Sequence, residues 1–180
     1  MPQIFPGRFA AKMEGPFVVF LIGMRINRLF AFRQWMQVAR AMPPMIKELM
    51  RQPELGLLHV ENAVYWPGAL IIQYWRSFDQ LHAYAHDRNA AHLPAWAEFN
   101  RRIGNNGAVG IWHETYVVQP NSFESIYANM PRFGLARAGG HEPVIGRINS
   151  ARRRMGMADD PTVETPQLAP QPLARNAPNP

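Results

Sequence analysis

Two ionisable side chains stand next to each other in the apolar run "AVGIWHETYVVQP", residues 108–120, namely His113 and Glu114. The run predicts a β-strand, in which neighbouring side chains point to opposite faces, so one of the two must face whatever lies under the sheet. An ionisable group on an apolar wall has a shifted pKa and can transfer a proton. The structural alternative is that His113 hydrogen-bonds to backbone or a neighbouring strand, while Glu114 pairs with Arg25 or Arg76.

Further histidines could bind a metal or haem iron. His82 and His86 are four residues apart, which places them on one face of a predicted helix and would suit a metal. Two histidines without a third ligand equally describe a solvated helix face. His92 lies four residues before Trp96 and seven before Phe99, on the same helical stripe, and its alternative role is to cap the start of that segment.

A neutral amide and several aromatic rings could line a ligand site. Gln73 shares strand parity with Trp75, and an amide beside an aromatic ring suits a quinone-like or carbonyl-bearing ligand. Tyr116 and Trp96 are further candidates for substrate contact. No phosphate-binding glycine loop, dinucleotide fingerprint or Walker motif occurs, so a tightly bound flavin or nicotinamide cofactor is not indicated.

Composition narrows the class of protein. The 180 residues have a net charge of +6 and contain no cysteine, which excludes disulfides, a thiolate nucleophile and a Cys-based zinc site. We expect a cytoplasmic protein. The most apolar run, residues 16–24, is too short to span a membrane, so no membrane partner is expected. No dense basic stripe occurs in the part expected to fold, so a nucleic-acid partner is not expected either.

The elements that must position these residues alternate between strands and helices. Strands are predicted at 17–26, 56–66, 69–77 and 108–118, and helices at 31–50, from Phe78 to about His86, and from near Leu93. Pro43–Pro44 should kink or split the first helix. Ser77 is the predicted N-cap of the second, with Gln80 at the capping-box position.

The order β-α-β-β-α-β predicts a ferredoxin-like α+β fold with both helices on one face of a four-stranded antiparallel sheet. Apolar residues occupy both the odd-numbered and the even-numbered positions of the strands, so both faces of the sheet are apolar. The face opposite the helices must therefore also be covered. A second copy would do so, giving a homodimer around an enclosed cavity. We expect His113 to face this cavity, with Trp112 and Tyr116 under the helices. Residues 1–15 are predicted to be an irregular arm, 16–136 the domain and 137–180 an extended, largely disordered tail.

Several runs within residues 16–136 resemble one known family. They are "VVFLIGMRINR", "GLL", "YWRSFDQLHAYAH", "AHLPAWAEFN", "VGIWHETYVV" and "ESIYANMPRFGLA". The family is one of monooxygenases named after a fumagillin-biosynthesis enzyme, formerly a domain of unknown function. It is similar to the dimeric α+β barrel superfamily, which includes antibiotic-biosynthesis and haem-degrading monooxygenases, chlorite dismutases and aldoxime dehydratases.

The resemblance implies a monooxygenase that oxidises a small apolar compound, aromatic or polyketide-like, with dioxygen. In the first hypothesis no cofactor is required, because the substrate anion itself reduces dioxygen. The protein then supplies a proton acceptor, a dry cavity and a polar anchor. His113 would be the base or anchor and Glu114 its partner or the alternate base. Trp75 would line the cavity, while Arg76 and Arg25 would steady an oxyanion.

Two alternatives stay open at this point. The first is a haem enzyme, similar to an aldoxime dehydratase or a haem-degrading enzyme, with His92, His86 or His113 as the iron ligand. The second is a non-catalytic dimeric module that binds a small apolar ligand.

Overall fold

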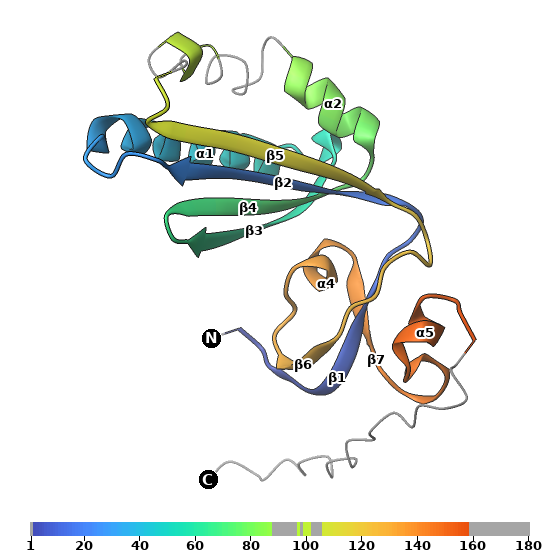
Figure 1. The fold of residues 1–180 in the computed structure, drawn as a ribbon. Helices are drawn as coiled ribbons and strands as arrows, with labels where there is room; N and C mark the ends of the chain where they lie inside the picture. The colour runs from blue at the N-terminus through green and yellow to red at the C-terminus, as the bar shows by residue number, and fades with distance from the viewer. Residues whose placement is uncertain (1, 88–96, 98, 102–105, 159–180) are drawn as a thin grey trace, which may run out of the picture.

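The computed structural model describes residues 2–87, 97, 99–101 and 106–158, whose strands form two antiparallel sheets (Figure 1). The larger sheet has the strand order β3-β4-β2-β5 and the smaller has the order β6-β1-β7. The strands are β1 Phe5–Lys12, β2 Phe17–Ile26, β3 Leu57–Tyr65, β4 Gly68–Trp75, β5 Val109–Val118, β6 Tyr127–Met130 and β7 Gly140–Pro143. The helices are α1 Phe32–Arg51, α2 Phe78–His86, α4 Leu135–Ala138 and α5 Ala151–Arg154, with 3-10 helices η1 Pro53–Leu55 and η2 Gly146–Ile148.

The order β2, α1, β3, β4, α2, β5 confirms the predicted ferredoxin-like α+β fold. β2 and β4 lie in the centre of the larger sheet, and β3 and β5 form its edges. The helix predicted from near Leu93 falls largely outside the described residues, of which 97 and 99–101 are helical. In the part of the chain that the structure describes, no helix is long and apolar enough to cross a membrane.

Local sequence signals explain the ends of the helices. The Ser77 hydroxyl accepts a hydrogen bond from the Gln80 N–H at 3.2 Å, so the predicted N-cap of α2 is confirmed. Pro43 and Pro44 do not split α1, which continues to Arg51. Each proline lacks an N–H and removes a helical hydrogen bond. Burial of the apolar side of the helix, including Leu49, offsets that loss.

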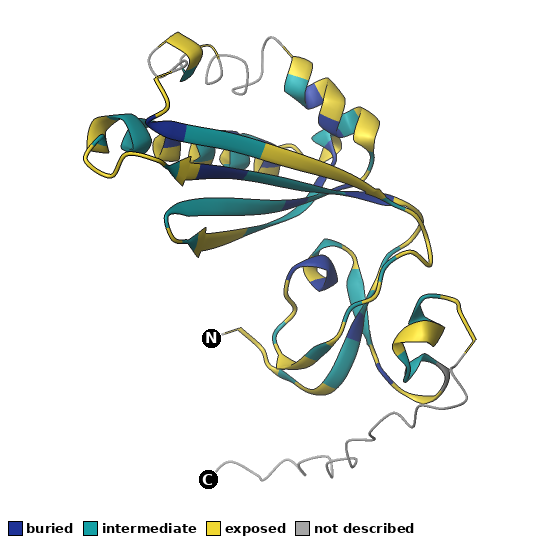
Figure 2. Ribbon diagram, in the orientation of Figure 1, coloured by how far each residue is buried: buried dark blue, intermediate teal, exposed yellow. Residues whose placement is uncertain are grey.

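The core lies between the larger sheet and its two long helices. One cluster contains Trp75 and Val18 from the strands, with Leu49 of α1 and Leu81 of α2. A second cluster surrounds Val38 of α1 and is completed by Met24, Ala108 and Val109. Both helices therefore bury their apolar sides against the same face of the sheet, and Figure 2 shows this burial fading along the C-terminal half of β5.

The smaller sheet corrects two expectations. Residues 5–12 form the central strand of this sheet rather than an irregular arm, and residues 140–154 contain β7 and α5 rather than only extended chain. The partners of β1 lie more than 110 residues away along the chain, so no hairpin signal marks it. The bulge between Phe5 and Arg8 also breaks the two-residue alternation by which a strand is predicted.

Candidate functional site

The face of the larger sheet opposite α1 and α2 carries the candidate site, and we call it the open face. Val18 and Met24 of β2 pack toward the helices, so the odd-numbered residues of β2 point the other way. The strand register then defines two rows across the open face. The first row is His59, Tyr74, Val19 and Tyr116, and the second is Glu61, Ile72, Leu21 and Glu114.

A histidine and a carboxylate pair at the β3 end of these rows. His59 Nε2 lies 2.8 Å from Glu61 Oε1, and the two side chains are only 16% and 15% exposed. The Gly134 N–H donates to the same carboxylate oxygen at 3.0 Å, just before α4. Gly134 has a φ of +54°, and a Cβ there would lie 3.0 Å from the Tyr74 hydroxyl. Glycine at position 134 therefore lets the segment before α4 lie close to the His59–Glu61 pair.

The surroundings of Glu61 keep its carboxylate charged. Burial by itself would raise the pKa of the Glu61 carboxyl. Hydrogen bonds from the Gly134 N–H and His59, together with the charges of His59 and Arg137, outweigh burial and lower the pKa below its ordinary value. The carboxylate can therefore fix the orientation of the His59 ring and stabilise an imidazolium that forms when His59 takes up a proton.

Two tyrosines flank the pair. The Tyr74 ring is nearly parallel to His59, with 6.4 Å between ring centroids. Tyr127, from β6, accepts a hydrogen bond from the Ala136 N–H at 3.4 Å. Burial raises the pKa of both phenols, and the nearby Glu61 charge raises each further. Both hydroxyls therefore keep their protons at neutral pH and are available as hydrogen-bond donors.

Trp112 and Tyr65 lie at the end of the open face away from the His59–Glu61 pair. The Trp112 indole N–H donates to the Tyr65 hydroxyl at 3.0 Å, and that hydroxyl donates to the Met24 carbonyl at 3.0 Å. Trp112 can lie across the sheet because Gly23 has no side chain, since a Cβ there would be 2.7 Å from the indole ring. Between this pair and the His59–Glu61 pair, the face is floored by Val19, Leu21, Leu70 and Ile72.

The open face thus combines an apolar floor with a buried acid–base pair and protonated phenols. An imidazole held by a carboxylate can accept a proton from a bound molecule. The phenols can donate to a carbonyl or an oxyanion. The apolar floor suits a flat hydrophobic ligand.

The orientation predicted for His113 is wrong. Val109 and Ile111 pack into the helix-side core, so His113, on the same parity, also points to the helix side, where its ring lies 5.6 Å from Phe20. Glu114 and Tyr116 lie on the open face, both exposed, with the Tyr116 hydroxyl donating to Glu114 at 2.5 Å. The register of β5 is fixed by the apolar residues that enter the core at its start.

The structure places Trp75 in the core instead of on a cavity wall. Trp75 is 1% exposed and its indole N–H donates to Gln73, itself 4% exposed, at 2.8 Å. The predicted neighbourhood of Gln73 and Trp75 is present, but on the helix side of the sheet. Arg76 and Arg25 are exposed, Arg25 on the open-face parity of β2. None of these four residues contacts the His59–Glu61 pair in any recorded hydrogen bond or ion pair of the described residues.

The histidines considered as haem ligands lie elsewhere. His82 and His86 stack on α2 with 4.1 Å between ring centroids, and both are exposed. His86 Nδ1 lies 2.8 Å from the His82 carbonyl, so one ring nitrogen of His86 is engaged within the helix. His92 and Trp96 lie outside the described residues. Within those residues, no group of three or more metal-ligating side chains occurs.

His59 and Glu61 are not among the site residues predicted from the sequence. The signal was present, because "LLHVENAVY" places the two residues two apart on a predicted strand, hence on one face. His113 and Glu114 were predicted because they are neighbours in the sequence, although neighbouring side chains on a strand point to opposite faces. Tyr127 could not be linked to this pair from the sequence, since only the tertiary fold brings β6 beside β3.

Comparison with known proteins identifies the family. A family model described as monooxygenase af470-like matches residues 17–135. The chain belongs to this family. Monooxygenase af470 of Aspergillus fumigatus is 31% identical over 127 residues, which cover 64% of this chain and 44% of the relative. The chain thus spans less than half the length of the curated relative it matches, and the resemblance found in the sequence is confirmed.

Two solved structures are also similar to this chain. SnoaB, a cofactor-independent oxygenase from Streptomyces nogalater, shares 12% identity over 57% of this chain and 93% of its own, with a TM-score of 0.41. A conserved protein of unknown function from Bacteroides thetaiotaomicron, described as a possible oxidoreductase, shares 9% identity over 58% of this chain and 100% of its own, with a TM-score of 0.39.

Proposed function

We propose that this chain is a monooxygenase that binds a small apolar substrate, aromatic or polyketide-like, on the open face. The observation that carries the proposal is the His59–Glu61 pair, 2.8 Å apart and largely buried beside an apolar floor, in a member of this family. His59 is the proton acceptor in this proposal and Glu61 positions it. The role moves from His113 and Glu114 to this pair because His113 faces the helix side.

The proposed reaction needs only substrate and dioxygen. His59 takes a proton from an acidic C–H or O–H of the substrate, and the resulting carbanion or enolate reduces dioxygen. A carbon–oxygen bond forms, and the peroxide takes a proton back to become a hydroperoxide. Loss of water, with the O–O and remaining C–H bonds broken, leaves a carbonyl, so that CH2 and O2 become C=O and H2O. The substrate supplies all electrons, and Tyr74 or Tyr127 can donate to its oxygen.

A second copy of the chain is part of the proposal. Val19, Leu21 and Ile72 are only partly buried on the open face. A second sheet placed against them would exclude water from the site and strengthen each electrostatic contact within it. The homodimer would enclose the substrate as the sequence analysis expects.

Oxygen consumption with a series of phenols, quinols and anthrone-like compounds tests this function. The wild-type chain should consume oxygen with at least one of them. His59→Asn and Glu61→Gln should each lower kcat by about 100-fold or more, since general base catalysis contributes about that much. Glu54→Gln, an exposed carboxylate on η1, is the matched control and should leave kcat unchanged.

His113→Asn decides between the two histidines. Loss of activity in His113→Asn with full activity in His59→Asn would overturn the assignment of the base. A correctly folded wild-type chain that binds such compounds but never consumes oxygen would support the non-catalytic module instead.

The haem hypothesis is tested separately by the visible spectrum of protein expressed with haem supplied. A stoichiometric Soret band, lost on substituting one of His86, His92 or His113, would replace the present proposal. We expect activity in preparations that have no such band.

A further inference from the structure

β2 ends and the β3–β4 hairpin turns at the same end of the larger sheet (Figure 1, left). The two loops at this end carry several exposed apolar side chains. We call this set the apolar tip. Its members have half or more of their surface exposed and are Leu29, Phe30, Phe32, Val64 and Trp66. Phe30 is fully exposed and Trp66 is 79% exposed, so neither ring is packed among the described residues.

The two loops of the apolar tip are held side by side. The Ile26 N–H donates to the Pro67 carbonyl at 2.8 Å, which ties the end of β2 to the hairpin turn. The Arg28 N–H donates to the Ala108 carbonyl at 3.1 Å, and the Trp35 indole N–H donates to the Leu29 carbonyl at 3.2 Å. These hydrogen bonds hold the loop after β2 beside the β3–β4 turn.

The two described segments that form the apolar tip carry basic residues and no acidic ones. Residues 24–47 and 62–78 contain no Asp or Glu. Arg25, Arg28 and Arg33 are exposed within them. Exposed aromatic residues beside arginines suit the interface of an anionic bilayer, where rings enter the acyl boundary and guanidinium groups meet headgroup phosphates.

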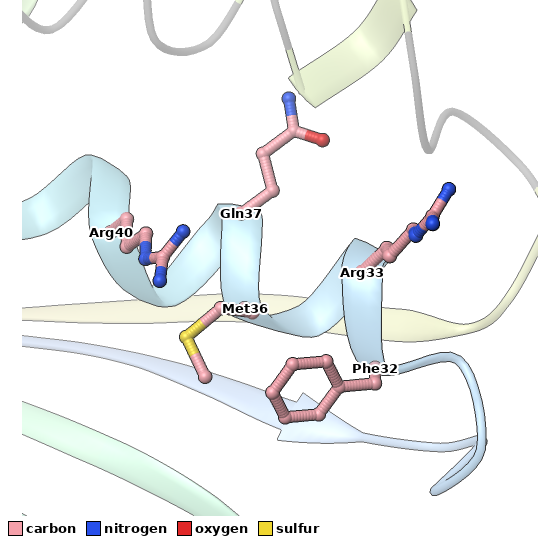
Figure 3. Close-up of a pocket in the computed structure, with 5 residues that line it drawn as sticks. All are labelled: Phe32, Arg33, Met36, Gln37 and Arg40. Carbon is pink, nitrogen blue, oxygen red and sulfur yellow. The ribbon is translucent and has the colours of Figure 1, made fainter.

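A hollow beside the tip offers a place for a headgroup. It opens on α1 with a volume of about 390 Å³ and is lined by Phe32, Arg33, Met36, Gln37 and Arg40. Figure 3 shows these side chains along α1, with Phe32 and Met36 toward the strands in this view and Arg33 and Gln37 away from them. Arg33 and Arg40 lie at the two ends of this hollow in Figure 3, and each guanidinium group can bind the phosphate of an anionic headgroup.

We propose that the apolar tip docks this protein on the surface of an anionic phospholipid membrane. Phe30 and Trp66 enter the interface, while Arg28, Arg33 and Arg40 bind lipid phosphates. This interaction is peripheral and goes beyond the proposed function. It uses residues distinct from His59 and Glu61, so either proposal can fail without the other. It departs from the expectation of no membrane partner, which was based on the lack of an apolar run long enough to span a bilayer.

Co-sedimentation of the full chain with vesicles tests the docking. Vesicles of phosphatidylcholine with phosphatidylglycerol should bind the wild type, and vesicles of pure phosphatidylcholine should bind it much less. The double variant Phe30→Ser/Trp66→Ser should bind at least about ten-fold more weakly, because it lacks the two rings that would enter the membrane. Ile4→Ser/Ile145→Ser removes two exposed apolar residues outside the apolar tip and should bind like the wild type.

Charge reversal separates the electrostatic part. Arg28→Glu/Arg33→Glu should abolish the preference for anionic vesicles, whereas Lys47→Glu/Arg51→Glu, farther along α1, should retain it. Salt at about 1 M, where the Debye length is about 3 Å, should release the wild type. Absence of binding by the wild type, or full binding by Phe30→Ser/Trp66→Ser, would overturn the proposal. So would a wild-type oligomer in lipid-free solution that this variant dissociates, since the tip would then be a protein interface.

Discussion

At the scale of single residues, the site depends on how the protein sets the charge state of a few groups. Glu61 is held as an anion by hydrogen bonds that outweigh its burial, whereas burial keeps Tyr74 and Tyr127 protonated. A charged acceptor and neutral donors therefore coexist within one small cluster. In the proposed reaction, the Glu61 carboxylate orients the His59 ring while the phenols donate hydrogen bonds to the substrate oxygen.

The lowered pKa of Glu61 predicts a pH-dependent contribution to stability. The Glu61 carboxyl has a lower pKa in the folded chain than its ordinary value of 4.5. Such a group stabilises the fold at pH values above the pKa of the unfolded chain, and this stabilisation is lost as pH falls through the lowered pKa of the folded chain. Glu61→Gln should lower the free energy of unfolding by about 1 kcal/mol at pH 7. The difference should shrink below pH 4.5.

Thermal denaturation of wild type and Glu61→Gln between pH 7 and pH 3 measures this effect. Glu54→Gln should show no such change with pH. A Tm difference for Glu61→Gln that stays constant across the range would contradict the ion-pair account of Glu61.

At the scale of elements, β2 and β4 separate a packed face from the open face, which carries the His59–Glu61 pair. Trp75 and Gln73 illustrate the packed face, because the amide of Gln73 provides the acceptor that a buried indole N–H requires. Trp112 illustrates the open face, where a glycine in the neighbouring strand makes room for a ring laid flat. Similar residue types thus serve packing on one side and site construction on the other.

Gly23→Ala should show the steric demand of the open face. A Cβ at Gly23 would lie 2.7 Å from the Trp112 ring, so the ring must move and its hydrogen bond to Tyr65 must break. We expect a loss of about 1–3 kcal/mol in the free energy of unfolding. Gly110→Ala is the matched control, because its nearest heavy atom would be 3.5 Å away. Urea denaturation followed by tryptophan fluorescence measures both, and equal stability of the two variants would refute this view of Gly23.

Trp75→Ala should act as a core substitution. Removal of a buried indole costs about 3–5 kcal/mol of unfolding free energy, which chemical denaturation can measure. If Trp75 lined the substrate cavity instead, the variant would keep its stability and change KM. The two outcomes separate the packing role from the binding role that the sequence predicted.

At the scale of the whole molecule, the open face couples the two sheets. The segment before α4, which extends from the smaller sheet, places the Gly134 N–H on Glu61, and β6 brings Tyr127 beside it. The remaining apolar floor is available for a second copy, as proposed above. The proposed catalytic site and the proposed homodimer interface would then share the open face.

Leu21→Arg tests the proposed assembly. An arginine in the middle of the apolar floor would place a charge inside the dimer interface, so the variant should be a folded monomer without activity. Thr115→Arg is the control, because Thr115 is exposed and lies on the helix side of β5. This variant should remain dimeric. Light scattering after size exclusion gives the mass directly, and a wild-type monomer would rule out the enclosed cavity.

The sequence alone determined the larger sheet, because its signals are local. The apolar runs of the strands, the helical spacing of residues 31–50 and the Ser77 cap each act within a few residues, and the order of these elements predicts the ferredoxin-like fold. The sequence also showed the family. Only the tertiary structure decided which face each strand residue takes, because the burial of Val109 and Ile111 under α1 sets the register of β5 and turns His113 toward the helices. The smaller sheet and the site at His59 and Glu61 likewise depend on contacts between distant segments, whose pairing no local pattern records.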